Sequence, residues 1–227
     1  MCVPEFFAPM ANLAPNAPEP SSLLRHRVRV FVDFWNYSLS MRNHDREFRA
    51  DWAKLGPALS HAAADVVAVT AQAEYQGMNV YGSYDPNSEK DRRMHQWATR
   101  TLDTFPGVSV SMVPRHKKKA APKCPICHKP VAYCPACEAD MRGTEEKGVD
   151  VRMATDMISL AWIDNYDIAV LVSSDRDFVP VAEFLETRGI KVIHGKFPPM
   201  GAELTARCWG SVDVASQREG FRLNRPR

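Results

Sequence analysis

Apolar residues form short runs along the chain, separated by stretches with helical character. Residues 27–33 are rich in β-branched side chains and end in a polar turn, which predicts a buried strand that leads into a loop. Similar runs at 108–113, 168–173 and 190–193 predict further strands. One more strand, or a pair of strands, is expected between 66 and 84.

Helix-forming segments lie between these strands. Gly56 and Pro57 are expected to break or kink the first predicted helix, and Gly189 to end the fourth. The alternation predicts an α/β fold, a three-layer α/β/α sandwich around a mainly parallel sheet. The predicted helices cover 51–64, 88–105, 150–163, 177–187 and 202–209.

The alternation is interrupted once, and the two ends of the chain lie outside it. Residues 1–24 hold five prolines among alanines and are interpreted as a flexible lead-in. The interruption, at 114–146, is a basic segment that contains four of the six cysteines. Residues 25–113 and 147–213 then form one domain, and 214–227 form a basic tail.

Composition places the chain among soluble globular proteins, with 227 residues, 45% hydrophobic and 25% charged. Its apolar runs are far shorter than the ~20 residues that span a bilayer. Residues 1–24 carry two acids and no Lys or Arg, unlike an export signal, so a cytoplasmic protein is expected. Net charge is only +2, so affinity for an anionic polymer must come from local clusters of charge.

Four cysteines have the spacing of a metal site. They form two CxxC pairs with six residues between the pairs. Such pairs can place four thiolates around one Zn²⁺, and disulfides are not expected in a cytoplasmic protein. The predicted ligands of a structural Zn²⁺ are Cys124, Cys127, Cys134 and Cys137; the alternative is reduced thiols in a Pro-rich loop.

Basic residues precede and surround the first CxxC pair. Residues 114–130 hold six Lys or Arg and no acid. This pattern predicts a clamp for phosphate backbone, and a solvated loop is the alternative. Lys147 suits a phosphate contact and a solvent position equally well. The candidate substrate-binding residues are Ser174, Lys147, Arg115, Lys117, Lys118 and Lys119.

Acidic residues lie where two predicted strands end. Asp33 follows the first strand, and Asp175 and Asp177 follow the strand at 168–173. Ligands of parallel α/β sheets bind beyond the carboxyl ends of the strands, so these positions predict an active site. Asp150 opens the helix before the second of these strands, and Asp156 lies ~240° further round that helix on the edge of an apolar stripe.

Several carboxylates at one sheet edge repel each other unless a divalent cation neutralises them. A set of oxygen ligands suits Mg²⁺ or Mn²⁺ rather than Zn²⁺. Taken singly, Asp150, Asp175 and Asp177 are also good helix caps, and Asp156 can pair with Arg152 four residues away. Their joint occurrence with Asp33 favours a metal site.

Three blocks of sequence resemble a known family. They are Val30-Phe-Val-Asp33-Phe-Trp-Asn36, Lys147-Gly-Val-Asp150 followed by Asp156, and Val170-Leu-Val-Ser-Ser-Asp175-Arg-Asp177-Phe178-Val-Pro180. Together, within 27–195, they look like the NYN domain of the PIN-like nucleases, in its LabA-like branch. The chain has Ser173-Ser174-Asp175 where the family often has Ser-Gly-Asp, and the cysteine insertion is not part of the family pattern.

The resemblance implies a three-layer sandwich that cleaves RNA endonucleolytically with Mg²⁺ or Mn²⁺. It implies a metal site at Asp33, Asp156, Asp175 and Asp177, with Asp150 close by and Asn36 and Ser174 as polar neighbours; the candidate catalytic set is Asp33, Asn36, Asp150, Asp156, Asp175 and Asp177. Metal-activated water would attack the phosphodiester. Neither a GxSxG elbow nor a phosphate-binding P-loop is present in the sequence.

Two other functions fit the same residues. One is a non-catalytic RNA-binding or adaptor protein that acts through the basic zinc module. The other is a nuclease or phosphatase directed at DNA or nucleotides, because carboxylates alone do not read a 2′-hydroxyl. The RNA partner, single-stranded or structured, follows from the leading hypothesis, and the sequence does not indicate an oligomeric state.

Overall fold

A computed structural model describes residues 24–223, so the lead-in predicted at 1–24 falls almost wholly outside the described part, as do the last four residues. Six strands form one sheet in the order β3-β2-β1-β6-β7-β8, and every neighbouring pair is parallel. Their bounds are β1 (Arg25–Asp33), β2 (Gln72–Tyr84), β3 (Val108–Pro114), β6 (Ile168–Val172), β7 (Lys191–Lys196) and β8 (Gly210–Asp213).

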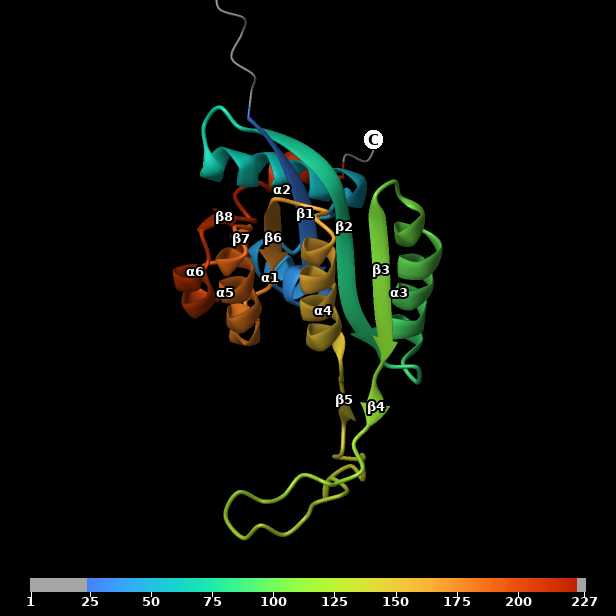
Figure 1. Cartoon of the computed structure of the whole chain (residues 1–227). Helices are drawn as coiled ribbons and strands as arrows, with labels where there is room; N and C mark the ends of the chain where they lie inside the picture. Colours follow the sequence, from blue (N-terminus) through green and yellow to red (C-terminus); the bar gives the residue numbers. More distant parts are fainter. Residues whose placement is uncertain (1–23, 224–227) are drawn as a thin grey trace, which may run out of the picture.

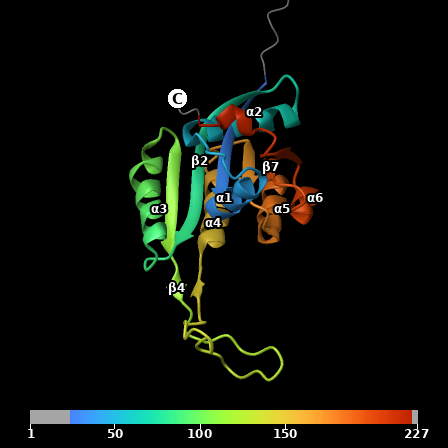
Figure 2. The ribbon, with the colours of Figure 1, turned by 180° about the vertical axis from the view of Figure 1, so that it is seen from behind.

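Helices cover both faces of this sheet (Figures 1 and 2). On one face lie α1 (Phe34–His44), α2 (Trp52–Val67) and α3 (Glu89–Arg100), and on the other lie α4 (Val149–Trp162), α5 (Val179–Thr187) and α6 (Ala202–Arg207). The three-layer α/β fold predicted from the sequence is confirmed. No helix among residues 24–223 has the length and apolar character needed to cross a bilayer.

The sheet separates two apolar cores, and strand pleating assigns side chains to each. Val28, Val30 and Val32 of β1 face α1 and α2, whereas Phe31 faces α4 and the ring of Tyr166, 5.5 Å away. All of these positions are fully or almost fully buried because helices cover both sides of a parallel sheet. At the centre of the sheet, Val30, Phe31 and Val32 therefore form a continuous apolar run.

Some elements differ from those predicted. The loop expected after Asp33 is the start of α1, and Pro57 lies inside α2 without ending it. Of the two alternatives expected between 66 and 84, one strand or a pair, the structure has the single strand β2. The tail predicted from 214 packs against the domain instead, since Phe221 of η3 (Arg218–Phe221) is fully buried against Phe48. Two more short 3₁₀ helices, η1 (Leu102–Thr104) and η2 (Arg176–Phe178), complete the domain.

The cysteine insertion leaves the sheet at its carboxyl edge. Its two arms pair as the antiparallel strands β4 (His116–Lys117) and β5 (Thr144–Glu145). β4 follows β3 almost directly, and β5 leads into α4. The insertion therefore hangs below the edge at which every strand of the sheet ends (Figure 1).

Candidate functional site

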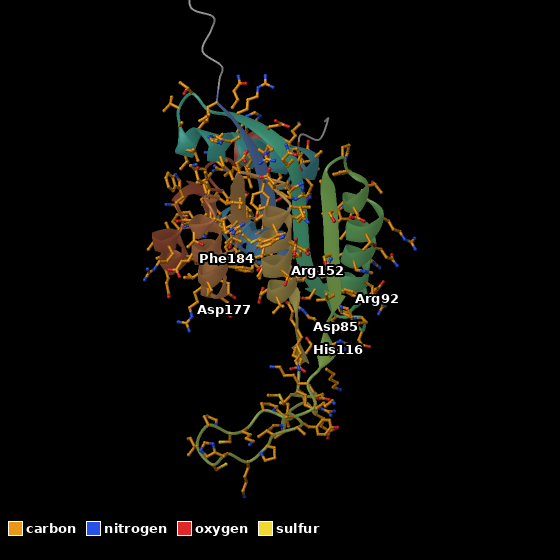
Figure 3. The ribbon with its side chains drawn as sticks, viewed as in Figure 1. Asp85, Arg92, His116, Arg152, Asp177 and Phe184 are labelled. Carbon is orange, nitrogen blue, oxygen red and sulfur yellow. The ribbon has the colours of Figure 1, made fainter. Side chains whose placement is uncertain are left out.

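Acidic side chains from three elements gather at the carboxyl edge of the sheet. Asp33 ends β1, Asp150 lies in the first turn of α4, and Asp175 and Asp177 follow β6. The pKa of Asp150 is raised, first by burial and then by repulsion from Asp175, Glu146 and Asp177. These four aspartates, called the acidic cluster below, thus lie near one another. Figure 3 shows Asp177 at the end of the domain from which the insertion extends.

Asp33 is held rigidly within this cluster. Its Oδ1 accepts hydrogen bonds from the backbone N–H groups of Trp35 and Asn36, both at 3.0 Å, which caps α1. Burial raises the pKa of Asp33 to about 6, against the effect of these N–H groups, and the carboxylates of Asp150 and Glu146 add to the rise. Burial and the neighbouring carboxylates thus both disfavour the charged form of Asp33, and a bound cation would favour it.

Asp175 repeats this arrangement on the neighbouring strand. Its Oδ1 accepts the N–H of Asp177 at 2.9 Å and so caps the short helix η2. For Asp33 and Asp175 alike, one carboxylate oxygen is used by the backbone and Oδ2 makes no hydrogen bond within residues 24–223. Each aspartate therefore combines a fixed orientation with one oxygen available to a ligand.

Two neutral side chains near the acidic cluster have buried atoms without partners. Asn36 Oδ1 and Ser174 Oγ are both inaccessible to solvent and make no hydrogen bond with any described residue. Buried polar atoms are normally paired, so each points to a ligand at this edge. Carboxylate, amide and hydroxyl oxygens together are the donor set that suits Mg²⁺ or Mn²⁺.

Glu146 also belongs to this site, although sequence reasoning missed it. Its Oε2 is hydrogen-bonded to the Ser83 hydroxyl at the end of β2 and lies 3.6 Å from Arg115 Nη2. The Arg115 guanidinium also donates to Ser83 Oγ at 2.8 Å and lies 5.2 Å from the ring centre of Trp35. Arg115, predicted to bind substrate, is thus an ion-pair partner of Glu146 where the insertion joins the domain.

Asp156, predicted as a metal ligand, has one oxygen engaged by two side chains. Its Oδ2 accepts hydrogen bonds from the Tyr81 hydroxyl and from Arg152 Nε, each at 3.0 Å. The i,i+4 pairing with Arg152 is the structural alternative that the sequence suggests for this residue. Across residues 24–223, no three His, Cys, Asp or Glu side chains are close enough to enclose a metal ion as they stand. The acidic cluster is accordingly an open set of ligands.

The four cysteines of the insertion likewise do not come together as a four-thiolate site in the described residues. Each pair nevertheless forms the same turn. The N–H of Cys124 donates to the Lys129 carbonyl at 2.9 Å, and that of Cys134 donates to the Ala139 carbonyl at 2.8 Å. The fifth residue of each turn, His128 or Glu138, has φ 58 and donates its N–H to the first cysteine's carbonyl at 2.9 Å.

Backbone N–H groups in these turns also favour thiolate forms. The pKa of Cys124 is lowered by the N–H groups of Cys127 and Ile126, and that of Cys134 by those of Ala136 and Cys137. A thiolate is the form of cysteine that binds metal. The two turns are therefore alike, and each presents two sulfurs.

The predicted basic residues differ in what they contact. Lys117 pairs with Asp140 at 2.6 Å, and Lys147 pairs with Glu145 at 3.0 Å. Lys118 and Lys119 are exposed and form no ion pair with the part of the chain described here. Those two lysines are the ones whose charge is available to a phosphate.

Comparison with known proteins identifies the domain. Residues 27–208 match the NYN domain, a stretch that contains the whole acidic cluster and the insertion. The chain belongs to the NYN family. NYN domains are generally nucleases of the PIN-like group.

One solved structure has a similar chain. A protein of unknown function from Vibrio parahaemolyticus RIMD 2210633 is similar at 19% identity, with a TM-score of 0.49, over 90% of this chain and 100% of its own. No curated protein matches the chain. The NYN assignment therefore rests on the domain match alone.

Proposed function

We propose that this NYN domain is a divalent-metal-dependent endoribonuclease whose site is the acidic cluster. The observation that carries the proposal is the convergence of Asp33, Asp150 and Asp175 beside two buried oxygens without partners, those of Asn36 and Ser174. Like charges and orphaned oxygens at one place are costly unless a cation binds there. Membership of the NYN family supports the same interpretation.

The acidic cluster would bind the metal, and the two neutral side chains beside it would orient the reactants. Asp33 and Asp175 present Oδ2 to Mg²⁺ or Mn²⁺, since their Oδ1 atoms are held by backbone N–H groups. Asp150 and Asp177 complete the carboxylate set, and Asn36 Oδ1 and Ser174 Oγ orient water or a phosphate oxygen. A bound divalent cation supplies Lewis-acid activation of water and neutralises charge on the phosphodiester.

The insertion is proposed to hold the RNA. It extends from the edge that carries the acidic cluster, so a strand bound along Lys118 and Lys119 reaches the acids without crossing the domain. Lys117, Lys147 and Arg115, whose charges are partly neutralised by acids, are proposed to contribute less. Contacts to phosphate give affinity that falls with salt and carries no sequence preference.

We also propose that the insertion binds one structural Zn²⁺ through Cys124, Cys127, Cys134 and Cys137. The support is the equivalence of the two turns, whose lowered thiol pKa values favour metal-binding thiolates. Bringing the two turns together requires a movement of the insertion, whose arms β4 and β5 pair with each other through only two residue pairs.

Cleavage of labelled single-stranded RNA in EDTA, Mg²⁺ or Mn²⁺ tests the nuclease. Asp175→Asn and Asp33→Asn are expected to abolish cutting, while Asp65→Asn, an exposed aspartate on α2, serves as the matched control. Cutting by either site variant at the wild-type rate would refute the assignment. A DNA strand of the same sequence distinguishes ribonuclease from deoxyribonuclease activity.

A second candidate function is non-catalytic RNA binding through the insertion. This alternative is favoured by the open spacing of the acids. Among residues 24–223, no three acidic side chains lie close enough together to enclose a cation. RNA binding that survives Asp33→Asn and Asp175→Asn but fails in Cys124→Ser, with no cleavage by the wild type under any metal, would establish this alternative.

A further inference from the structure

A cavity on the α1 face of the domain, with a volume of about 230 Å³, is lined by three arginines. Arg42 lies in the last turn of α1, and Arg46 and Arg49 lie in the loop before α2. All three are exposed, and none forms an ion pair with a described residue. No acidic side chain among residues 24–223 lines this cavity, called the arginine pocket below.

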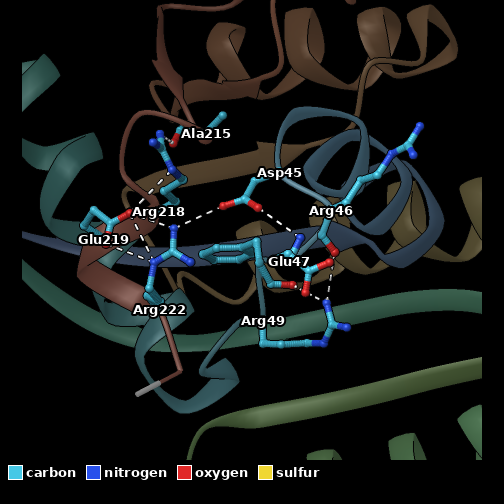
Figure 4. Close-up of polar contacts among 9 residues, drawn as sticks. Asp45, Arg46, Glu47, Arg49, Ala215, Arg218, Glu219 and Arg222 are labelled. Carbon is cyan, nitrogen blue, oxygen red and sulfur yellow. Dashed lines mark hydrogen bonds and ion pairs between the residues drawn. The ribbon is translucent and has the colours of Figure 1, made fainter. Parts of the chain in front are cut away.

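The loop acids do not neutralise these arginines. Asp45 is engaged by Arg222, with Nη2 of Arg222 3.2 Å from Asp45 Oδ2, and it accepts the N–H of Glu47. Figure 4 shows this ion pair with the guanidinium of Arg46 pointing away from it. The loop holds three acids, Asp45, Glu47 and Asp51, but Asp51 pairs with Lys54 and none of the three forms an ion pair with the arginines of the pocket.

Aromatic rings form the floor of the arginine pocket. Trp52 is half-buried and packs edge-on against Tyr37 at 5.2 Å. Tyr37 is only 3% exposed, and its hydroxyl is buried without a hydrogen-bond partner among the described residues. Three exposed guanidinium groups in a pocket that Tyr37 and Trp52 also line point to an anionic ligand with an apolar face.

The size and lining of the pocket favour one component of a nucleic acid. A volume of about 230 Å³ is below the range of about 300–1,000 Å³ for whole drug-sized ligands. It suits a single phosphate or base, and guanidinium groups beside an indole ring are the combination that binds phosphate and stacks on bases. An acidic peptide would use the arginines but gain little from Trp52.

The position of the pocket relates it to the acidic cluster. Asp33 caps the start of α1 and Arg42 lies near its end, a separation of about 14 Å at 1.5 Å per residue. A stacked single strand covers that distance in roughly four nucleotides at 3.4 Å each. Trp52 also stacks on Phe34, the residue after Asp33, at 5.9 Å.

We propose that the arginine pocket is a second binding site for single-stranded nucleic acid, which holds a phosphate and base about four nucleotides from the scissile bond. The inference rests on the proposed function for the identity of the strand. It extends that function by giving the domain a binding surface on the α1 face, in addition to the insertion at the carboxyl edge.

Binding of a fluorescent 12-nucleotide oligouridylate, measured by anisotropy in EDTA so that nothing is cut, tests the site. Arg42→Glu/Arg46→Glu is expected to weaken binding about tenfold and to reduce the slope of log K against log salt by about 1.4, or ~0.7 for each phosphate that the variant no longer neutralises. Arg25→Glu/Arg100→Glu changes the charge equally at exposed positions elsewhere and is expected to alter neither quantity by as much.

Further outcomes keep the test decisive. Arg46→Gln, which keeps a polar side chain, is expected to lower the salt slope by about half as much, and it serves if the double variant does not fold. An unchanged affinity and slope in folded Arg42→Glu/Arg46→Glu would overturn the proposal, as would an oligoglutamate that binds the wild type more tightly than the oligouridylate.

The binding assay does not depend on catalysis. Loss of binding in the arginine variant of a protein that cuts no RNA in Mg²⁺ or Mn²⁺ would refute the nuclease and leave the arginine pocket standing. Unchanged binding in the arginine variant of a protein whose cleavage depends on Asp175 would refute the arginine pocket alone.

Discussion

The hydroxyl of Tyr81 donates to Asp156 Oδ2 across 3.0 Å and so joins the end region of β2 to the middle of α4. Arg152 Nε donates to the same oxygen at 3.0 Å. Burial and the adjacent carboxylate both raise the pKa of Tyr81, so its hydroxyl remains protonated and can donate. Oδ2 of Asp156 thereby joins α4 to the sheet.

Asp156→Asn is therefore expected to retain much more cleavage activity than Asp150→Asn. An asparagine keeps an acceptor for Tyr81 and loses only the ion pair with Arg152, which is worth about 0.5 kcal/mol on an exposed helix face. Asp150 lies in the acidic cluster, so its replacement removes a ligand. Single-turnover cleavage rates at saturating Mn²⁺ measure the contrast, and equal losses in the two variants would make Asp156 a ligand after all.

Asp33→Asn is expected to stabilise the protein in EDTA while it abolishes cleavage. The asparagine can still cap α1, and it removes a carboxylate whose pKa is about 6 in the fold. An acid whose folded pKa is raised has no effect on stability below its unfolded pKa, 3.8, and destabilises the fold as pH rises through about 6. The expected gain in unfolding free energy at pH 7.5 is about 1–2 kcal/mol.

Thermal unfolding of wild type and Asp33→Asn at a series of pH values measures this gain. The difference should vanish near pH 4, and saturating Mn²⁺ should reverse it at pH 7.5 because only the wild type keeps the full ligand set. A difference that does not change with pH would show that ionisation of the buried Asp33 carboxyl is not its cause. Asp65→Asn again provides the control.

Periodicity is enough to predict the layers of the fold, because buried parallel strands and amphipathic helices leave different patterns. It fails for α1, since Phe34, Trp35 and Asn36 resemble a loop in sequence although Asp33 caps a helix there. It also misses β8, whose four residues hold one apolar side chain, Val212, that becomes buried only by pairing with β7.

Part of the acidic cluster can be predicted from the order of strands and helices. Asp33 and Asp175 lie directly after strands, so the topology alone brings them to one edge. Glu146 gives no such signal, because its place depends on how the insertion returns to α4 and on its hydrogen bond with Ser83. Glu146 becomes a candidate only if one expects the returning arm of the insertion to meet the end of β2.

Glu146→Gln is expected to raise the Mn²⁺ concentration needed for half-maximal cleavage and to leave the rate at saturation nearly unchanged. Glu146 contributes negative charge to the site, as its effect on the pKa of Asp33 and Asp150 shows, but its Oε2 is already bonded to Ser83 and Arg115. A metal titration of initial rates tests this, with Glu145→Gln as the neighbouring control. A loss of rate at saturating metal would place Glu146 among the ligands.

Cys124→Ser and Cys134→Ser are expected to have the same effect, because the two turns share their hydrogen bonds and backbone conformation. Each should lose the one Zn²⁺ per chain that elemental analysis of the wild type is expected to detect. The melting temperature of the domain should hardly change, since no residue of 114–146 belongs to either buried core. Retention of zinc by one variant only would show that the pairs bind metal independently.

His194 is expected to position the strand end that carries Ser174 and Asp175. The ring is fully buried in β7, with Nε2 2.7 Å from the Ser173 carbonyl and Nδ1 2.7 Å from Thr205 Oγ1. A carbonyl can only accept, so Nε2 carries the proton, and burial lowers the pKa of His194 so that the ring is neutral at pH 7. Thr205 Oγ1 then donates to Nδ1.

His194→Leu removes both bonds, leaves the Ser173 carbonyl buried without a donor, and should cost about 1–3 kcal/mol of stability. Cleavage should slow at saturating RNA, and His194→Gln, which can donate to the Ser173 carbonyl, should recover part of the rate.

Because the pKa of His194 is lower in the folded protein, the stability that His194 contributes is present above its unfolded pKa of 6.5 and lost as pH falls below it. Unfolding measured between pH 5 and 8 should show that loss in the wild type and not in His194→Gln, whereas parallel pH profiles would mean that folding does not change the pKa of His194.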